Sequence, residues 1–168
     1  MKITATEEYG MRCMLQLALH HGRTLPLSEL AASERIAVPF AAKVLMRLRR
    51  AGLVVALRGR HGGYALAAAP KEITVLRILK SLGKPLFDST FCRDHGSPGA
   101  ADCSRLTDCS LRPVWAHFDA LLGRFFEQTT LADLAAGERR TDRHLQERWP
   151  IMIPVVAAEP TDAKRGSQ

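Results

Sequence analysis

The chain has 168 residues, 46% of them hydrophobic, and a formal net charge of +7. This length suits one medium domain or a small domain with an appendage, and no apolar run approaches the roughly 20 residues of a membrane span. The first residues also lack the long apolar stretch of a signal peptide, so we expect a cytoplasmic protein that does not contact membranes.

The N-terminal part of the sequence predicts a helix-turn-helix. A first helix is expected over residues 5–21, with Thr6 as its cap. Two shorter helices follow: SELAASE, with Ser28 at its start, and a second over residues 38–51 that has Pro39 in its first turn. The second of these helices has a basic outer face, as a recognition helix requires. Its inward-facing apolar stripe consists of Ala41, Val44, Leu45 and Leu48.

A β-hairpin is predicted directly after this second helix. LVVAL is typical of a strand, RGRHGG supplies a glycine-rich turn, and YALA is typical of the returning strand. A hairpin that follows a recognition helix makes a winged helix. Thr74 is then expected to cap a further helix, VLRILKSLG, which ends near Gly83.

The C-terminal part predicts one long helix over residues 113–128, after a loop over about 86–111. Its stripe of large apolar side chains could pack on its own domain, but the N-terminal unit looks complete without it, so a symmetric helix–helix dimer is favoured. A short helix, LADLAAG, is expected from Thr130, and residues 141–168 are expected to form a flexible tail. The side chains expected in the dimer contact are Val114, Trp115, Phe118, Leu121, Leu122 and Phe125.

We therefore expect a mainly α fold, a winged helix-turn-helix with a small β-hairpin wing and a long dimerisation helix. The DNA-binding domain would span residues 1–85, the cysteine-containing loop 86–111, the dimerisation helix with its short successor 112–140, and the tail 141–168.

The positive charge is concentrated in the predicted DNA-binding unit. Residues 35–71 contain eight Lys or Arg and no Asp or Glu, whereas the rest of the chain holds 16 basic and 17 acidic residues. A solvated basic surface is the simpler explanation, but the absence of balancing acids favours a polyanion such as double-stranded DNA.

Base contacts need side chains near the start of the recognition helix, and arginines on a wing suit a narrow minor groove. Arg47 is expected to contact phosphate, and Arg49 is expected to be a surface residue without a DNA contact. The expected DNA contacts are Ser28, Pro39, Phe40, Ala42, Lys43, Arg47, Arg58, Arg60 and His61.

Three of the four cysteines, Cys92, Cys103 and Cys109, lie in the loop, with ten and five residues between them. The intervening RDHGSPGAAD and SRLTD are small, polar and turn-forming, so the loop can bring three thiolates together. This spacing favours about equally an iron–sulphur cluster, a zinc ion completed by His95, and a cluster-free thiol switch. Cys13 is expected to be a buried core thiol. No set of residues typical of catalysis stands out, so we expect neither an enzyme nor a small-molecule substrate.

The strings LSELAASERIAVPFAAKVLMRLRRAGLVVALRGRHGGYALA and RPVWAHFDALLGRFFEQTTLADL resemble the Rrf-two family of bacterial winged-helix transcription regulators, over about residues 1–137. The RG-x-x-GGY-x-L wing is specific to that family. The resemblance implies a homodimer that binds a palindromic operator. As in IscR-like and NsrR-like members, it also implies a [2Fe–2S] or [4Fe–4S] cluster on the three cysteines. The protein would then be a repressor that senses nitric oxide, redox stress or cluster status.

The resemblance also bears on the fourth cluster ligand. IscR-like members have a histidine three residues after the last cysteine, but Arg112 stands there and cannot ligate iron. NsrR-like members use an acidic residue of the other subunit, just before the tyrosine of the first helix, and Glu8 in TEEYGMR matches it better than Glu7. The expected ligands are Cys92, Cys103, Cys109 and Glu8. The long first cysteine spacing leaves the cluster type open and keeps His95, Asp94 and Asp102 as candidate local ligands. The alternative is a zinc-containing or thiol-switch regulator of the same fold.

Overall fold

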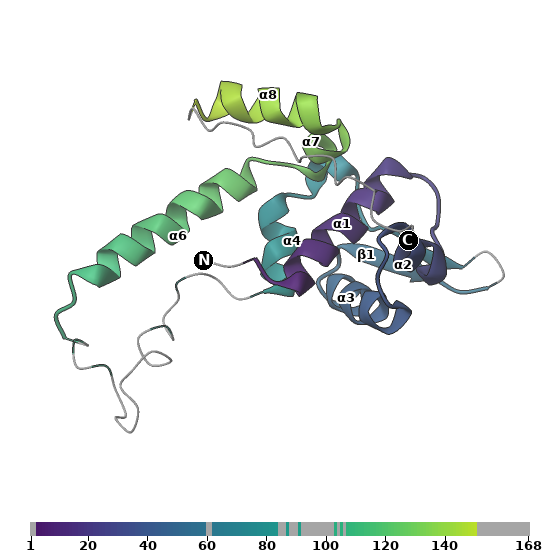
Figure 1. The fold of residues 1–168 in the computed structure, drawn as a ribbon, viewed down its shortest axis with the longest axis horizontal. Helices are drawn as coiled ribbons and strands as arrows, with labels where there is room; N and C mark the ends of the chain where they lie inside the picture. The colour runs from purple at the N-terminus through teal and green to yellow at the C-terminus, as the bar shows by residue number, and fades with distance from the viewer. Residues whose placement is uncertain are drawn as a thin grey trace, which may run out of the picture.

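The computed structural model describes residues 3–59, 62–83, 87, 91, 103, 105 and 107–150. Its elements are α1 (Ala5–Leu19), α2 (Leu27–Ser33), α3 (Val38–Arg50), β1 (Val54–Leu57), β2 (Gly63–Leu66), the 3₁₀ turn η1 (Pro70–Glu72), α4 (Val75–Leu82), α6 (Leu111–Glu127), α7 (Leu131–Ala135) and α8 (Glu138–Arg148). The expected mainly α fold with a small β-hairpin is confirmed. In Figure 1, α1–α4, the hairpin and α7 form one body, and α6 extends from it as an arm. No helix in the described ranges is long and apolar enough to cross a membrane.

The core of the body forms where α1, α3 and α4 meet. The predicted inner stripe of α3 is confirmed, because all four of its side chains are buried. Each large aliphatic side chain buried in this way contributes about 1.5–3 kcal/mol. The cluster around them includes Cys13, Met14, Leu17, Leu30, Leu53, Ile73, Ile78, Leu82 and Leu131.

Of the four predicted helix-capping residues, two are wrong and two are confirmed. Thr4, rather than Thr6, caps α1, because Glu7 lies three residues after Thr4 and completes a capping box: Glu7 Oε2 accepts from Thr4 N at 2.8 Å. Helix α2 begins at Leu27 after Pro26, and Ser28 lies exposed inside its first turn without capping it. The predicted threonine caps of α4 and α7 are both present.

The wing is an antiparallel hairpin in which Val54 pairs with Leu66 and Leu57 with Gly63. It is attached to the linker between α1 and α2 by a short bridge. Leu25 N donates to Tyr64 O at 2.9 Å, and Tyr64 N donates to Leu25 O at 2.8 Å. This bridge fixes the base of the wing to the body.

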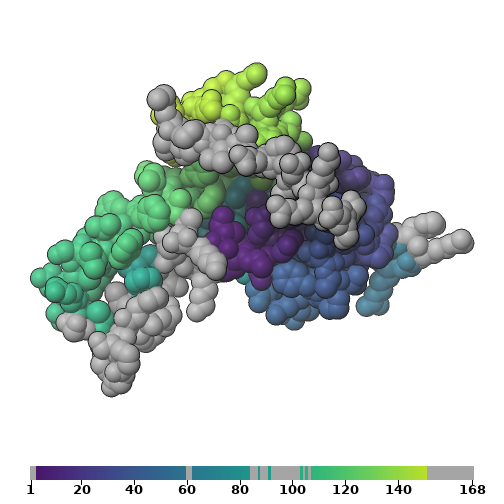
Figure 2. Space-filling view, viewed as in Figure 1, coloured from purple at the N-terminus to yellow at the C-terminus, as the bar shows by residue number. Residues whose placement is uncertain are grey.

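The long helix α6 begins at Leu111, two residues earlier than expected, with Ser110 as its N-cap. Pro113 fits inside the first turn because the backbone nitrogens there have no helical acceptor. None of the side chains of α6 is buried in the described part of the chain, and the helix projects from the body in the space-filling view (Figure 2). The large apolar side chains exposed on it are Leu111, Val114, Trp115, Phe118 and Leu121.

The C-terminal end of α6 is tied to the start of α4. Thr74 and Thr130 form an isolated antiparallel bridge. Beside it, Val75 N donates to Thr129 O at 2.9 Å, and Leu131 N donates to Ile73 O at 2.8 Å. The arm is therefore anchored to the body at the end opposite the cysteine loop.

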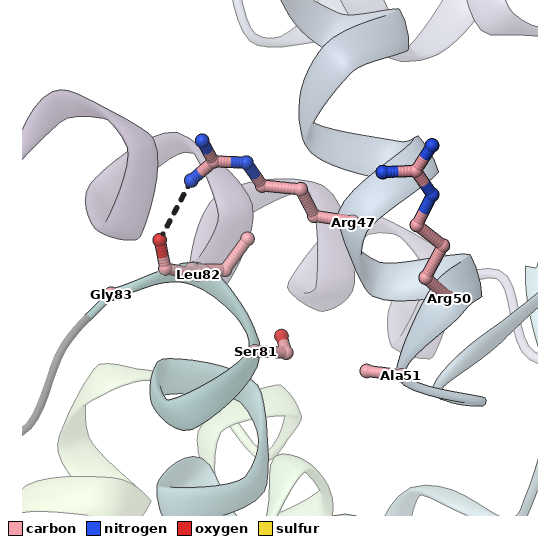
Figure 3. A pocket seen from close by; sticks show the side chains of 6 residues that line it. All are labelled: Arg47, Arg50, Ala51, Ser81, Leu82 and Gly83. Atoms are coloured by element: carbon pink, nitrogen blue, oxygen red, sulfur yellow. Dashed lines mark hydrogen bonds between the residues drawn. The ribbon is translucent and has the colours of Figure 1, made fainter.

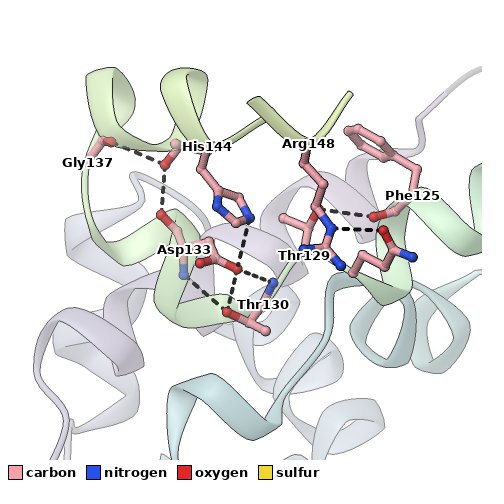
Figure 4. Close-up of polar contacts among 9 residues, drawn as sticks. Phe125, Thr129, Thr130, Asp133, Gly137, His144 and Arg148 are labelled. Atoms are coloured by element: carbon pink, nitrogen blue, oxygen red, sulfur yellow. Dashed lines mark hydrogen bonds and ion pairs between the residues drawn. The ribbon is translucent and has the colours of Figure 1, made fainter. Parts of the chain in front are cut away.

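The prediction of a flexible tail from residue 141 is wrong for its first part, because α8 runs from Glu138 to Arg148. This helix is held by polar contacts rather than by an apolar stripe (Figure 4). Thr141 Oγ1 donates to Asp133 O at 2.8 Å, and Arg148 Nε donates to Gln128 Oε1 at 2.8 Å. The remainder of the predicted tail, residues 151–168, lies outside the described residues.

We expect Leu45→Ala to lower the free energy of unfolding by about 2–5 kcal/mol, because Leu45 is fully buried and its truncation leaves a cavity. Met46→Ala is the matched control, since Met46 lies on the same helix but is 43% exposed. Urea unfolding followed by circular dichroism measures both. Equal losses in the two variants would contradict the orientation of α3.

Candidate functional site

The outer face of α3 combines a cation with apolar groups and carries no acidic residue. Pro39 and Lys43 are exposed and Ala42 is half-buried. Val38 and Met46, which were not among the expected DNA contacts, are also exposed large apolar side chains of this helix. Such a surface suits a major groove, where thymine methyl groups accept apolar contacts and guanine edges accept hydrogen bonds from lysine.

Of the other expected DNA contacts, Phe40 and Arg47 contact other parts of the protein, whereas Arg58 is exposed. The half-buried Phe40 packs edge-to-face on Tyr9 of α1, with ring centroids 5.8 Å apart. The guanidinium of Arg47 donates from Nη1 to the backbone oxygen of Leu82 at 2.9 Å (Figure 3). Arg58 is exposed just beyond β1. The two remaining wing candidates, Arg60 and His61, lie outside the described residues.

A buried carboxylate joins α1 to the turn of the helix-turn-helix. Glu34, only 5% exposed, accepts from Arg12 Nε at 2.6 Å and from Gln16 Nε2 at 2.7 Å. The hydrogen bond to Glu34 raises the pKa of Arg12 above its usual value, and the Arg12 guanidinium also lies 5.1 Å from the ring centre of Tyr9. The sequence pattern does not predict this set, because Glu34 lies 22 residues from Arg12 and 18 from Gln16.

The cysteines fall into two kinds. Cys13 is fully buried, and burial raises the pKa of its thiol to about 11, which confirms the expected core thiol. Cys103 and Cys109 are free thiols that are only half-buried, and Cys109 lies two residues before α6. Cys92 lies outside the described residues. Within the described ranges, no three His, Cys, Asp or Glu side chains gather closely enough to hold a metal ion.

The first turn of α1 presents two carboxylates in different situations. Glu7 Oε2 accepts from the backbone nitrogen and the hydroxyl of Thr4, so this carboxylate is engaged in the cap. Glu8 is exposed and makes no side-chain hydrogen bond to another described residue. Figure 1 shows the start of α1 beside α4 in the body, whereas α6 starts at the far end of the arm. The first turn of α1, which holds Glu8, is therefore well separated from the start of α6 within one chain.

The sequence model of the Rrf2 family, described as an iron-dependent transcriptional regulator, matches residues 3–137. The chain belongs to the Rrf2 family. Among its Rrf2 relatives, the regulator IscR of Vibrio atlanticus is 30% identical over 135 residues, which are 80% of this chain and 75% of that protein. A putative HTH-type transcriptional regulator of Mycobacterium tuberculosis is 36% identical over 141 residues, 82% of this chain and 83% of that protein.

Solved structures of Rrf2-type regulators share this fold. CymR, described as the global cysteine regulator of B. subtilis, superposes with a TM-score of 0.64 at 29% identity, over 81% of this chain and 97% of CymR. IscR of T. potens superposes with a TM-score of 0.63 at 28% identity, over 80% of this chain and 85% of that chain. The protein is thus a winged-helix transcriptional regulator similar to both IscR and CymR.

We expect Glu34→Ala to lower the free energy of unfolding by about 1–3 kcal/mol, because it leaves the Arg12 guanidinium and the Gln16 amide without their acceptor. Glu29→Ala is the matched control. Glu29 also pairs with an arginine, Arg23, but both side chains are largely exposed, and such pairs contribute only about 0–1 kcal/mol. Denaturant midpoints compare the two variants, and a similar loss in both would contradict the structural role of Glu34.

Proposed function

We propose that the protein is a homodimeric repressor whose operator binding is controlled by an iron–sulphur cluster. One observation carries the proposal: two free, half-buried thiols, Cys103 and Cys109, precede in the chain a projecting helix whose apolar face is exposed. Exposed apolar faces of this extent mark interaction surfaces. Pairing of two such arms brings the cysteine loop of one chain near the other chain.

The donor set of the chain fits a cluster. Cys103 and Cys109 are accessible thiols, Cys92 adds a third, and the exposed Glu8 of the partner subunit supplies a carboxylate. Thiolates hold both [2Fe–2S] and [4Fe–4S] clusters, and oxygen ligands can replace one of them. A bound cluster would supply a centre that reacts with nitric oxide or oxidants. Glu7 is the weaker candidate because its carboxylate already closes the capping box.

The exposed stripe of α6 supports the dimer. Phe118 and Leu121 lie near its middle, and Leu122 is half-buried beside them. Phe125, near the end of the stripe, is 5.7 Å from the ring of Trp149 in the same chain, so it is already partly covered. In the dimer two recognition helices would reach half-sites about 34 Å apart on one face of a palindromic operator.

On each half-site, the start of α3 would read bases through Pro39, Phe40, Ala42 and Lys43, while Ser28 would lie near the backbone. The wing would place Arg58, Arg60 and His61 at the adjacent minor groove or its phosphates. We propose no catalytic role for any of these residues.

A thiol-switch regulator is the second candidate. The likeness to CymR, described as a global cysteine regulator, covers nearly the whole of that chain. Cys103 and Cys109 are free thiols, and a reversible disulfide would need no metal. A zinc-containing regulator is a further alternative, distinguished by metal analysis.

The first prediction of the proposal concerns metal content. Anaerobically purified protein is expected to be brown and to contain iron and acid-labile sulphide, and Cys103→Ala is expected to lose the visible absorption. Cys13→Ala is the matched control, since it removes a buried thiol and should keep the colour. Glu8→Ala should keep the fold and alter the absorption bands, whereas Glu29→Ala should not. Colourless wild-type protein with zinc, or with no metal after reconstitution, would support the alternatives instead.

The wing contact predicts the salt dependence of binding. Arg58→Ala should weaken operator binding and make the slope of log affinity against log salt concentration shallower by about one, because one cation no longer displaces a counterion. Arg49→Ala removes the same charge from an exposed position expected to lie off the DNA, so its slope should match wild type. Fluorescence anisotropy at several salt concentrations measures both slopes. An unchanged slope for Arg58→Ala removes it from the contacts.

A further inference from the structure

Leu82 and Gly83, at the end of α4 shortly before the cysteine loop, lie against helix α1. A Cβ added at Gly10 of α1 would lie 2.2 Å from Leu82 Cδ1, so the two helices meet as closely as a glycine allows. A Cβ added at Gly83 would lie 2.0 Å from Glu7 Oε1, so the capping carboxylate of α1 rests on the end of α4. The root of the loop is thus a packed junction.

The recognition helix reaches the same junction through one side chain. Arg47 is half-buried, and its Nη1 donates to the backbone oxygen of Leu82 at 2.9 Å. That oxygen belongs to the last turn of α4, where carbonyl groups have no helical donor. A hydrogen bond from a guanidinium is stronger than one from a neutral group. Arg47 is therefore the donor that links the end of α4 to α3.

The C-terminal ends of two helices lie beside Arg47. The hollow around it is lined by Arg50, Ala51, Ser81 and Gly83, and both α3 and α4 end there. Helix C-termini carry partial negative charge, which arginines neutralise. Figure 3 shows the guanidinium of Arg47 joined to Leu82, while that of Arg50 lies apart from this bond.

We propose that Arg47 is a positioning residue that couples the recognition helix to the root of the cysteine loop, and that it does not contact DNA phosphate. Arg47 lies one helical turn after Lys43 on the same side of α3, so the bond to Leu82 sets how α3 is rolled about its axis. A change in the loop that moves Leu82 alters the angle at which Lys43 meets the groove. This inference rests on the proposed control of operator binding by the cysteine loop.

The test compares Arg47→Gln with Arg50→Gln, which removes the same charge one turn away from an exposed side chain with no such bond to Leu82. Operator affinity is measured across salt concentrations for anaerobic, metal-loaded protein and for the same protein after chelation. Wild type is expected to bind with a loaded-to-chelated affinity ratio of about 5–150. Arg47→Gln should bring that ratio to within about twofold of one and leave the salt slope unchanged. Arg50→Gln should keep the ratio.

Arg47→Lys is included in case Arg47→Gln does not fold, because lysine keeps the positive charge and a group that can donate a hydrogen bond. If Arg47 contacts phosphate, this variant keeps both slope and ratio and Arg47→Gln loses about one unit of slope, which overturns the proposal. A wild-type ratio preserved in Arg47→Gln also overturns it. If wild type binds the operator equally well with and without metal, the proposed control by the loop is wrong, and the salt slope alone tests Arg47. An unchanged slope in Arg47→Gln supports Arg47 as a positioning residue, and a shallower slope shows that it contacts phosphate.

Discussion

Helix α1 is the element on which the orientation of the DNA-reading surface depends. Its buried side lies against α3, α4 and α7, and the buried carboxylate of Glu34 fastens it to the turn before the recognition helix. A buried charge that loses its partners costs several kcal/mol, so this turn cannot rotate away from α1 at low cost. One helix therefore fixes both the recognition helix and the helix that leads into the cysteine loop.

This arrangement places the recognition helix and the end of α4, which leads into the cysteine loop, within a few contacts of each other. Tyr9 touches Phe40 at the start of α3, and Arg47 touches Leu82 at the end of α4. Two sites can be coupled when events at each of them shift the position of one shared structural element. In the proposed regulator α3 would be such an element, because it contacts α1 near its start and the end of α4 near its own end.

Features that depend on local chemistry could be predicted from the sequence. The stripe of α3 repeats at helical spacing, and Thr74 and Thr130 stand directly before helices where a hydroxyl can accept from the backbone. Features that depend on distant partners could not. Arg12 and Glu34 are 22 residues apart, and Arg47 and Leu82 are 35 apart, so their pairing appears only once the chain is folded.

Helix α8 escaped prediction for a related reason. Its sequence, ERRTDRHLQER, is almost entirely polar, so there was no apolar period to signal a helix. Other parts of the chain stabilise it instead: the side chain of Gln128, just after α6, accepts a hydrogen bond from Arg148, and the backbone oxygen of Asp133 in α7 accepts one from Thr141. A set of cluster ligands could be proposed only through the family resemblance, since spacing alone does not distinguish iron, zinc and disulfide chemistry.

The backbone bonds that tie α6 to the body lie beside its C-terminal end, which gives the helix the mechanics of a lever. Its 17 residues extend about 25 Å from the bridge between Thr74 and Thr130. A tilt of about 10° at that hinge would shift the far end, where Cys109 lies, by about 4 Å, while the backbone pairs at the hinge would barely change length. Small rearrangements at the hinge are thus amplified into displacements as large as the distance between neighbouring strands. In a dimer, the separation of the two winged helices would depend more on the tilt of α6 at this bridge than on the length of the helix.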